Sequence, residues 1–308
     1  LGVLSGYETI TTDHFVIRVD SQEDKILGEY MAEYLEEVYP ELVELYGYEP
    51  PQRSVFEIYN NAKGLSAHQW FSARMVGLPW IQTIGASTGM MVALASPTAS
   101  PQPYNWARVV KHEFVHVLTL QQTHFNIPHW FTEALAVTSE GIQRPAEWNR
   151  MLLERVPRGE LWSLDELTGI FVRPETPADW QFAYCQSRLY AQYMIETFGE
   201  ETISSMLDLY RKNVRTNDAI PQVFDMTAEK FDAGYRDFLK RIVEEELGGS
   251  AIEAPKSITD IEKEFNASPD NPSAMAAFAD SLFKAKRRRQ ARALAEQALE
   301  TSPREPLA

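Results

Sequence analysis

The first hundred or so residues carry a pattern of alternating apolar and polar positions that indicates a β-sheet. In residues 12–20, Phe15 and Ile17 fall on one face and Val16 on the other, as expected of a half-buried strand. The same alternation, or a short apolar run, predicts three further strands, at residues 53–59, 80–84 and 89–95. A turn at residues 85–88 is expected to join the last two of these strands.

The other segments follow a helical period, in which apolar residues recur every three or four positions. Residues 23–46 place apolar side chains on one face and acids on the other, and Gly47 is a typical helix stop. Pro40 is expected to kink this helix or to divide it into two pieces. Further helices are predicted at residues 109–120, 130–137, 147–156, 164–167, 179–198, 200–213, 219–224 and 227–247. Asn105 is a favourable N-cap residue for the first of these.

The stretch from Gly248 to Pro255 has the Gly, Ser and Pro content of a linker. Residues 272–303 after it resemble one tetratricopeptide repeat, with apolar or small residues where two helices would pack. These residues are Met275, Phe278, Ala279, Leu282, Ala291, Ala295 and Ala298. Because such repeats stack, we expect residues 257–266 to be a helix of a preceding unit and more repeats to follow Ala308.

The composition narrows the classes of protein that the chain can represent. Of the 308 residues, 44% are apolar and 24% are charged, as in ordinary soluble proteins, and this length fits one large domain or two modest ones. The formal net charge of −15 argues against nucleic acid as a partner and against adhesion to anionic membranes. No apolar stretch of about 18 residues predicts a transmembrane segment.

Cysteine content and the first residue bear on where the protein works. Cys185 is the only cysteine, which excludes an internal disulfide and fits a reducing compartment without assigning one. The chain begins at Leu1 rather than Met, so we expect a fragment or a processed form whose targeting signal lies outside the sequence. The expectation is a soluble protein of unassigned localisation.

The segment from Val109 to Leu120 is apolar nearly all round, and it contains His112-Glu113-x-x-His116. Residues four apart lie on the same face of a helix, so the two imidazoles can point one nitrogen each at a common centre. This spacing suits a zinc hydrolase, because Glu113 can take a proton from the attacking water. The alternative is two core histidines bonded to backbone carbonyls, with Glu113 paired to a Lys or Arg.

Catalytic zinc usually has three protein ligands, so a third is expected downstream. A turn at residues 126–128 is followed by the apolar segment 130–137, which predicts a second buried helix. Glu133 is the only acid in that segment, and a lone buried acid is costly unless it binds something. His124 and His129 flank the turn, and we favour a structural role for both over contact with the site or the substrate.

Together these segments resemble the gluzincin zinc metallopeptidases, of the MA type, whose second helix reads Trp-hydrophobic-x-Glu-Gly-x-Ala. The resemblance implies that His112, His116 and Glu133 bind one zinc ion and that Glu113 is the general base. Two features depart from the family: Ala134 stands at the usual Gly, and the gap from His116 to Glu133 is shorter than in the best-known members. Neither departure removes a ligand, and the resemblance covers roughly residues 50–210.

The resemblance also implies a tyrosine that assists the reaction and a strand that binds substrate. The segment Ala183–Ser187 resembles an Ala-Tyr-x-Gln-Ser segment of the family, and a hydroxyl there can donate to the developing oxyanion, so we nominate Tyr184. The alternative is a core aromatic residue, and Tyr190 or Tyr193 could serve instead. Gluzincins pair extended substrate with a sheet edge. Residues 90–95 are nominated for that role, and an inner core strand is equally compatible with them.

These expectations combine into an α+β fold, a zincin-like metallopeptidase domain followed by an all-α tetratricopeptide-like segment. The metallopeptidase domain is expected at residues 1–248, with the mixed sheet in 1–104 and the site helices and a helical subdomain in 105–248; the truncated repeat segment is expected at 249–308. The expected function is zinc-dependent hydrolysis of a peptide or protein substrate, with a protein partner bound by the repeat. Two alternatives stay open: an inactive zincin-like scaffold that acts as an interaction module through the repeat, and metal-assisted hydrolysis of another kind of bond.

Overall fold

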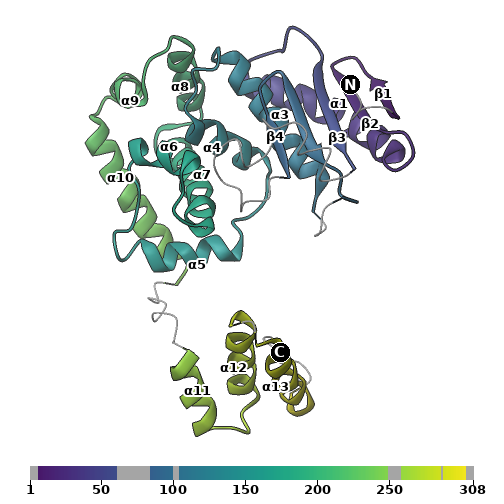
Figure 1. Ribbon diagram of the computed structural model, residues 1–308. Helices are drawn as coiled ribbons and strands as arrows, with labels where there is room; N and C mark the ends of the chain where they lie inside the picture. The colour runs from purple at the N-terminus through teal and green to yellow at the C-terminus, as the bar shows by residue number, and fades with distance from the viewer. Residues whose placement is uncertain (1–5, 61–83, 100–103, 249–257, 286, 303–308) are drawn as a thin grey trace. The chain divides into compact units, whose positions relative to one another are not determined.

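Figure 1 shows the computed structural model, which describes residues 6–60, 84–99, 104–248, 258–285 and 287–302. The chain divides into two units, Leu1–Gly249 and Ser250–Ala308. The first unit has a β-sheet with helices packed on it and a larger group of helices beyond. The described residues of the second unit contain helices and no strand.

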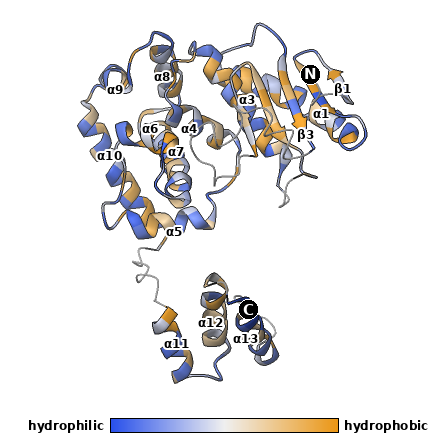
Figure 2. Cartoon of the chain, in the orientation of Figure 1, coloured by the Kyte–Doolittle hydropathy of each residue, from blue (hydrophilic) through white to orange (hydrophobic). Residues whose placement is uncertain are grey.

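In the described part of the chain, five strands form one mixed sheet in the order β1-β2-β3-β5-β4. They are β1 (Tyr7–Thr11), β2 (Phe15–Asp20), β3 (Ser54–Tyr59), β4 (Gly85–Ser87) and β5 (Met91–Ala95). The inner strands β2, β3 and β5 run parallel, and β1 and β4 are antiparallel at the two edges of the described sheet. The inner strands β2 and β5 are richest in the apolar residues drawn orange in Figure 2, and they pack under α1 and α3.

The sheet corrects two predictions that concern the strands nearest the candidate site. Residues 85–87, which we expected in a turn, form β4 because their backbone pairs with residues 92–94 of β5. Residues 90–95, which we nominated as a substrate-binding edge, lie mostly in β5 between β3 and β4, so that edge assignment is wrong and β4 is the described edge. Gly85, Ala86 and Ser87 carry no apolar alternation, and only pairing with β5 reveals them as a strand.

Two other differences concern β1 and the connection between β4 and β5. The short edge strand β1 was not predicted, and the strand predicted at residues 80–84 lies outside the described residues except for Ile84. Thr88 donates its N–H to the carbonyl of Met91 (2.9 Å), which closes a tight hairpin turn. Gly89 has a φ of 78° at the first central position of this turn, where a type II′ turn favours glycine.

Helices α1 (Lys25–Tyr46) and α3 (Trp106–Gln122) pack against each other and against the sheet. Aromatic rings fill the space between them: Phe114 of α3 lies edge-on to Phe15 of β2 (5.0 Å) and stacks on Tyr39 of α1 (5.8 Å). The α1 helix runs unbroken through Pro40, so the predicted division into two pieces is wrong. Pro40 is exposed, and water can satisfy the carbonyl that loses its partner there.

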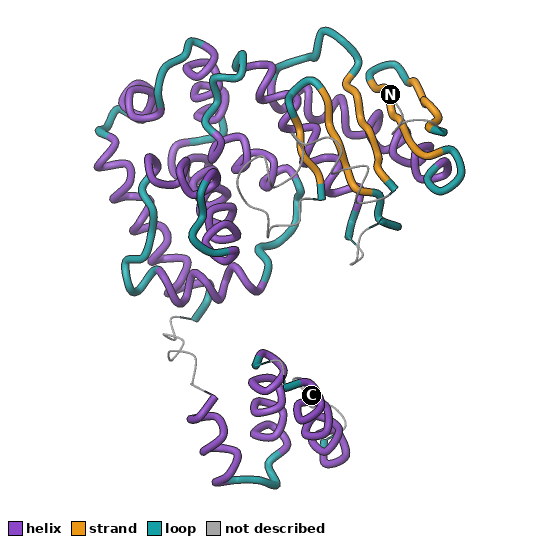
Figure 3. Tube along the Cα trace, viewed as in Figure 1, coloured by secondary structure: helices purple, strands orange, loops and turns teal. Residues whose placement is uncertain are grey.

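The rest of the first unit is helical (Figure 3). The helices are α4 (His129–Ser139), α5 (Ala146–Arg155), α6 (Leu164–Val172), α7 (Pro177–Phe198), α8 (Glu201–Arg211), α9 (Thr216–Phe224) and α10 (Ala228–Arg241), and α10 continues into a π-helical turn, η2 (Ile242–Glu246). Helix α4 packs on α3 and α7, and all residues from Trp130 to Val137 are buried. Among the described residues, no helix combines the length and apolar character needed to cross a bilayer.

The second unit contains α11 (Ile258–Ala267), α12 (Pro272–Lys284) and α13 (Arg288–Thr301). Its core joins Met275 of α12 to Ala298 of α13, and Phe278 and Leu282 of α12 to Ala291 of α13. The predicted packing residues of this unit are buried, apart from the half-buried Ala295. The predicted linker lies outside the described residues except for Gly248.

Candidate metal centre

The centre is built on helix α3, whose start is set by its sequence. The side chain of Asn105 accepts the N–H of Arg108 (3.2 Å), which satisfies one of the backbone donors left free at a helix start. The helix then follows the sheet, and Glu113 and His116 are buried on it while His112 is half-buried. Both imidazoles lie on one face because four residues separate them.

A turn brings α4 back against α3. After α3 ends at Gln122, His124 and Phe125 have φ angles of 52° and 64°, and Phe125 donates its N–H to the carbonyl of Leu120 (2.8 Å). This left-handed backbone costs about 1–2 kcal/mol per residue for side chains other than glycine. Pro128 then precedes α4 with an extended ψ of 147°. The chain reversal places α4 and Glu133 beside the two histidines.

Three ligand atoms converge between α3 and α4. His112 Nε2 and His116 Nε2 are 3.1 Å apart, and each lies 3.4 Å from Glu133 Oε2. In a tetrahedral zinc site with bonds of about 2.0–2.1 Å, the ligand atoms lie about 3.3 Å from one another. The three atoms therefore match one face of such a tetrahedron. Within the described part of the chain, this is the one group of three His, Cys, Asp or Glu that could hold a metal ion.

His112 is oriented by an acid that the sequence analysis did not identify. Its Nδ1 lies 2.9 Å from Glu140 Oε1, just after the end of α4, and the other oxygen of Glu140 lies 3.5 Å from Arg108 Nε. A carboxylate at Nδ1 favours the tautomer that carries its proton there. When His112 is neutral, its Nε2 carries the lone pair and faces His116 and Glu133.

His116 is oriented by a chain of hydroxyl groups. Thr119 donates to the carbonyl of Val115 (2.9 Å), so it accepts from Thr132 (2.9 Å), and Thr132 in turn accepts from His116 Nδ1 (2.8 Å). This order leaves one arrangement of protons, in which Nδ1 of His116 is the donor. Its Nε2 therefore carries the lone pair that a metal requires.

Glu133 is held at both oxygens. Oε2 faces the two Nε2 atoms, while Oε1 lies 3.0 Å from His129 Nε2, whose ring packs against Phe171. The structural role favoured for His129 is thus corrected, because the side chain contacts the site. His124 is exposed at the turn. Burial alone would raise the pKa of Glu133, but the neighbouring imidazoles of His116, His112 and His129 hold it well below the usual range.

Glu113 is a buried acid without a hydrogen-bond partner for one oxygen. Its exposure is 5%, and its Oε2 has no partner among the described residues. Burial, only partly offset by the charges of His116 and His112, raises the pKa of Glu113. Among the described residues, neither backbone carbonyls at the histidines nor a Lys or Arg partner of Glu113, as in our alternative interpretation, is found.

The charges of the centre are unbalanced without a cation. Glu113, Glu133 and Glu140 bring three carboxylates, and in the described part of the chain Arg108 beside Glu140 is the guanidinium in contact with them. Buried charges are costly unless they are paired or bind metal. With both imidazoles neutral, as metal binding requires, these groups leave two negative charges, which a divalent ion would balance, so the residues present fit the metal that their spacing predicts.

Tyr184 lies close to these carboxylates. Its ring is edge-on to Phe171 and Trp180, and burial, followed by the negative charges of Glu133, Glu113 and Glu140, raises the pKa of Tyr184 well above its ordinary value. The hydroxyl therefore remains a proton donor. Tyr190 donates to Asp232 (2.7 Å) and the hydroxyl of Tyr193 packs against Gly234, so both alternatives are engaged at α10.

The edge strand β4 passes directly over Glu113. A Cβ atom built on Gly85 would lie 2.7 Å from Glu113 Oε1, so any larger residue would displace that carboxylate. β4 pairs with β5 on one side, and its other side is an edge of the described sheet. The acid and the edge are therefore adjacent.

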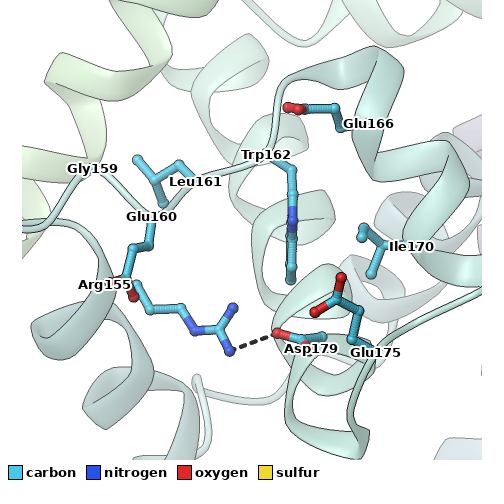
Figure 4. A pocket seen from close by; sticks show the side chains of 9 residues that line it. All are labelled: Arg155, Gly159, Glu160, Leu161, Trp162, Glu166, Ile170, Glu175 and Asp179. Carbon is cyan, nitrogen blue, oxygen red and sulfur yellow. Dashed lines mark hydrogen bonds and ion pairs between the residues drawn. The ribbon is translucent and has the colours of Figure 1, made fainter.

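A separate cavity of about 310 Å³ opens in the helical part (Figure 4). Arg155 donates to Asp179 (2.8 Å) across it and lies over the ring of Trp162 (5.4 Å). None of the predicted site residues lines it, so it is distinct from the candidate centre.

A comparison with known proteins matches most of the first unit to one family model. The family model described as Peptidase MA superfamily matches residues 42–241, or 200 of the 308 residues, and this range includes α3, α4 and α7. No curated protein matches the chain.

Proposed function

The chain belongs to the peptidase MA superfamily, and from that premise we propose that it is a zinc-dependent peptidase of the gluzincin type. His112, His116 and Glu133 would hold one zinc ion, and Glu113 would act as the general base. The observation that carries the proposal is the triangle of His112 Nε2, His116 Nε2 and Glu133 Oε2, with sides of 3.1, 3.4 and 3.4 Å. A zinc ion bound there would polarise the scissile carbonyl and lower the pKa of water.

Glu113 is suited to move the proton of the attacking water. The pKa of Glu113 is raised toward neutral pH, where a general base works best. Its Oε2, which has no partner among the described residues, can accept a proton and pass it to the leaving amine. The contact with Gly85 holds the carboxylate beside the β4 edge. Proton transfer by a positioned side chain contributes about 10²–10⁴-fold to the rate.

Tyr184 and His129 would assist from α7 and α4. Tyr184 stays protonated beside the carboxylates, so its hydroxyl can donate to the oxyanion that forms at the attacked carbonyl. His129 binds Glu133 Oε1 and thereby keeps Oε2 directed at the histidines.

Strand β4 would bind the substrate backbone in place of the strand that we first nominated. Its side away from β5 is an edge of the described sheet, and the backbone N–H and C=O groups of such an edge can pair with an extended peptide. Because Gly85 contacts Glu113, a peptide paired with β4 would present a carbonyl next to the base.

The remaining residues, 249–308, are proposed to form a tetratricopeptide-like segment that binds a protein partner. The burial of Met275, Phe278, Leu282 and Ala291 at the expected packing positions supports this. A scaffold without catalytic activity is the alternative function; it needs the zinc ligands but has no use for a buried acid such as Glu113.

Two measurements test the proposal. Elemental analysis of the purified chain should find about one zinc per chain, and the His116→Ala variant should lose it. Glu113→Gln should keep the zinc and lower peptide hydrolysis by at least about 10²-fold, with Glu147→Gln, an exposed acid on α5, as the control. Zinc without any hydrolysis would favour the scaffold, and a folded chain without zinc would remove the proposal altogether.

A further inference from the structure

The hairpin between β4 and β5 is fastened to the far end of the site helix. Gln121 of α3 donates to the carbonyl of Gly89 (2.6 Å). A Cβ atom built on Gly89 would lie 2.7 Å from Phe125 Cε1 and 3.0 Å from Leu120 Cβ, so the ring of Phe125 packs on the hairpin tip. The tip and the end of α3 therefore form one surface.

Two large apolar side chains on this surface face solvent. Met90 at the hairpin tip is 59% exposed, and Phe125 after α3 is 53% exposed. Phe125 is also held in the left-handed region, which bulky side chains rarely adopt. An exposed aromatic residue in strained backbone gains little for the fold, and strain of this kind is concentrated at binding sites.

Helix α3 and strand β4 run alongside each other from the base to this surface. At one end Gly85 contacts the carboxylate of Glu113, and at the other end Gly89 contacts Leu120 and Phe125. Gly85 and Gly89 are four residues apart, which corresponds to about 13 Å of extended chain. A peptide paired with β4 at the base would therefore reach Met90 and Phe125 about three or four residues from the scissile bond.

We propose that Met90 and Phe125 form an apolar subsite that selects a large apolar side chain three or four residues from the scissile bond. The inference rests on the proposed peptidase function and adds a substrate preference to it. The occupant is the substrate peptide itself, because the patch is continuous with the β4 edge that would bind its backbone. The two exposed side chains would lose contact with water when that residue binds.

The test uses the zinc-loaded chain and a library of extended peptides in which each position around the cleavage site is leucine, phenylalanine or serine. For the wild type, kcat/KM should be at least about tenfold higher for a peptide with leucine or phenylalanine at the predicted distance than for the same peptide with serine there. The difference should come mainly from a lower KM, and it should appear on one side of the cleavage site only. One extra apolar contact of this size corresponds to about 10–200-fold discrimination. The library also identifies on which side of the bond the subsite lies.

Phe125→Asn and Met90→Ser should remove this preference and leave the cleavage of serine-containing peptides unchanged. Asparagine tolerates left-handed backbone, so the melting temperature of Phe125→Asn should stay equal or rise. Leu45→Asn, at an equally exposed apolar residue on α1 (61%), is the matched control and should keep the preference.

Three outcomes would overturn the inference. A wild type that cleaves the library without a preference at that distance removes the subsite and leaves the peptidase intact. A Phe125→Asn variant that loses melting temperature and slows all peptides alike assigns the ring to the fold. A zinc-loaded wild type that cleaves no peptide removes the proposed function and the subsite with it.

Discussion

Two clusters of polar side chains in the first unit differ in whether they complete their own hydrogen bonds. Between α7 and α10, Tyr190 donates to one oxygen of Asp232 (2.7 Å) and Arg236 binds the other (2.8 Å). Tyr235 in the same cluster donates to the carbonyl of Gln186 (3.1 Å). These groups satisfy one another, as buried polar groups in a structural network do.

The cluster between α3 and α4 is incomplete. Oε2 of Glu113 and Oε2 of Glu133 have no hydrogen-bond partner among the described residues, and two imidazole nitrogens face each other at 3.1 Å. In the α7–α10 cluster Tyr190 and Tyr235 are fully buried, while Asp232 and Arg236 are half-buried, with side-chain exposures of 23% and 32%. What distinguishes the two clusters is that the α3–α4 cluster leaves acceptor atoms without partners among the described residues, as a cation site would, and the α7–α10 cluster does not.

Removal of zinc should have the largest effect, because it acts on the incomplete cluster alone. A ligand at about 1,000 times its Kd contributes about 4 kcal/mol to stability. For a unit of this size we expect chelation to lower the melting temperature by roughly 10 °C. Differential scanning calorimetry with and without a chelator measures it. His116→Ala should show no chelator effect, and a wild type that melts at the same temperature in both conditions would contradict the comparison.

Zinc affinity should depend on pH through His112. In the metal-free chain, burial alone would lower the pKa of His112, but hydrogen bonds and charges from Glu133 and Glu140 raise it from 6.5 to about 10. The proton therefore contributes stability that is fully present below about pH 6.5 and is lost as the pH rises through about 10. Because zinc must displace this proton, its affinity should rise about tenfold per pH unit between about pH 7 and 9.

Titration calorimetry in two buffers of different ionisation enthalpy measures this proton directly. We expect about one proton to be released for each zinc bound near pH 8. An Asp232→Ala chain should release the same number, since the α7–α10 cluster takes no part. Zinc binding that releases no proton and does not vary with pH would contradict the assigned state of His112.

Loss of the orienting groups should weaken zinc binding without abolishing it. Glu140→Gln removes the carboxylate at His112 Nδ1, and Thr132→Val removes the hydroxyl at His116 Nδ1. Such outer partners typically contribute 10–100-fold to metal affinity. Competition with a chromophoric chelator should show a loss in this range for each variant. If both variants bind zinc as tightly as the wild type, His112 and His116 keep their orientation without Glu140 and Thr132, and this prediction is wrong.

The smallest effect is expected in the complete cluster, and it should fall on stability alone. Asp232→Ala leaves Arg236 and the hydroxyl of Tyr190 without their acceptor, at a cost of about 1–3 kcal/mol. Urea unfolding should show a lower midpoint with an unchanged slope, and the zinc content should be that of the wild type. A change in zinc content would mean that the two clusters are coupled through α7.

Much of the helical part could be predicted from the sequence because its signals are local. The apolar period, together with Asn105 at one helix start and Gly199 just after the end of another, places α3 and α7 within a few residues of their observed bounds. The strand β4 could not be predicted, because Gly85, Ala86 and Ser87 show no alternation and pair only through a partner in β5. Because β4 was not predicted, we assigned the edge of the sheet to β5, which lies between β3 and β4.

Parts of the site were open to prediction for the same reason. His129 stands four residues before Glu133 and Glu140 seven residues after it, so helical spacing could have put all three on one face of α4. Thr119 and Thr132 gave no such signal, since a buried threonine is ordinary and their contact joins two helices.

The sequence by itself determined which residues could bind zinc, because the period of an α-helix fixes the side on which His112 and His116 lie. It also isolated Glu133 as the one acid of an apolar helix. Only the tertiary structure decided the 3.4 Å distances from Glu133 to both histidines, the unpaired oxygen of Glu113 and the neighbour of that acid at Gly85. These depend on how α3, α4 and β4 pack, and packing brings together residues that no local period connects.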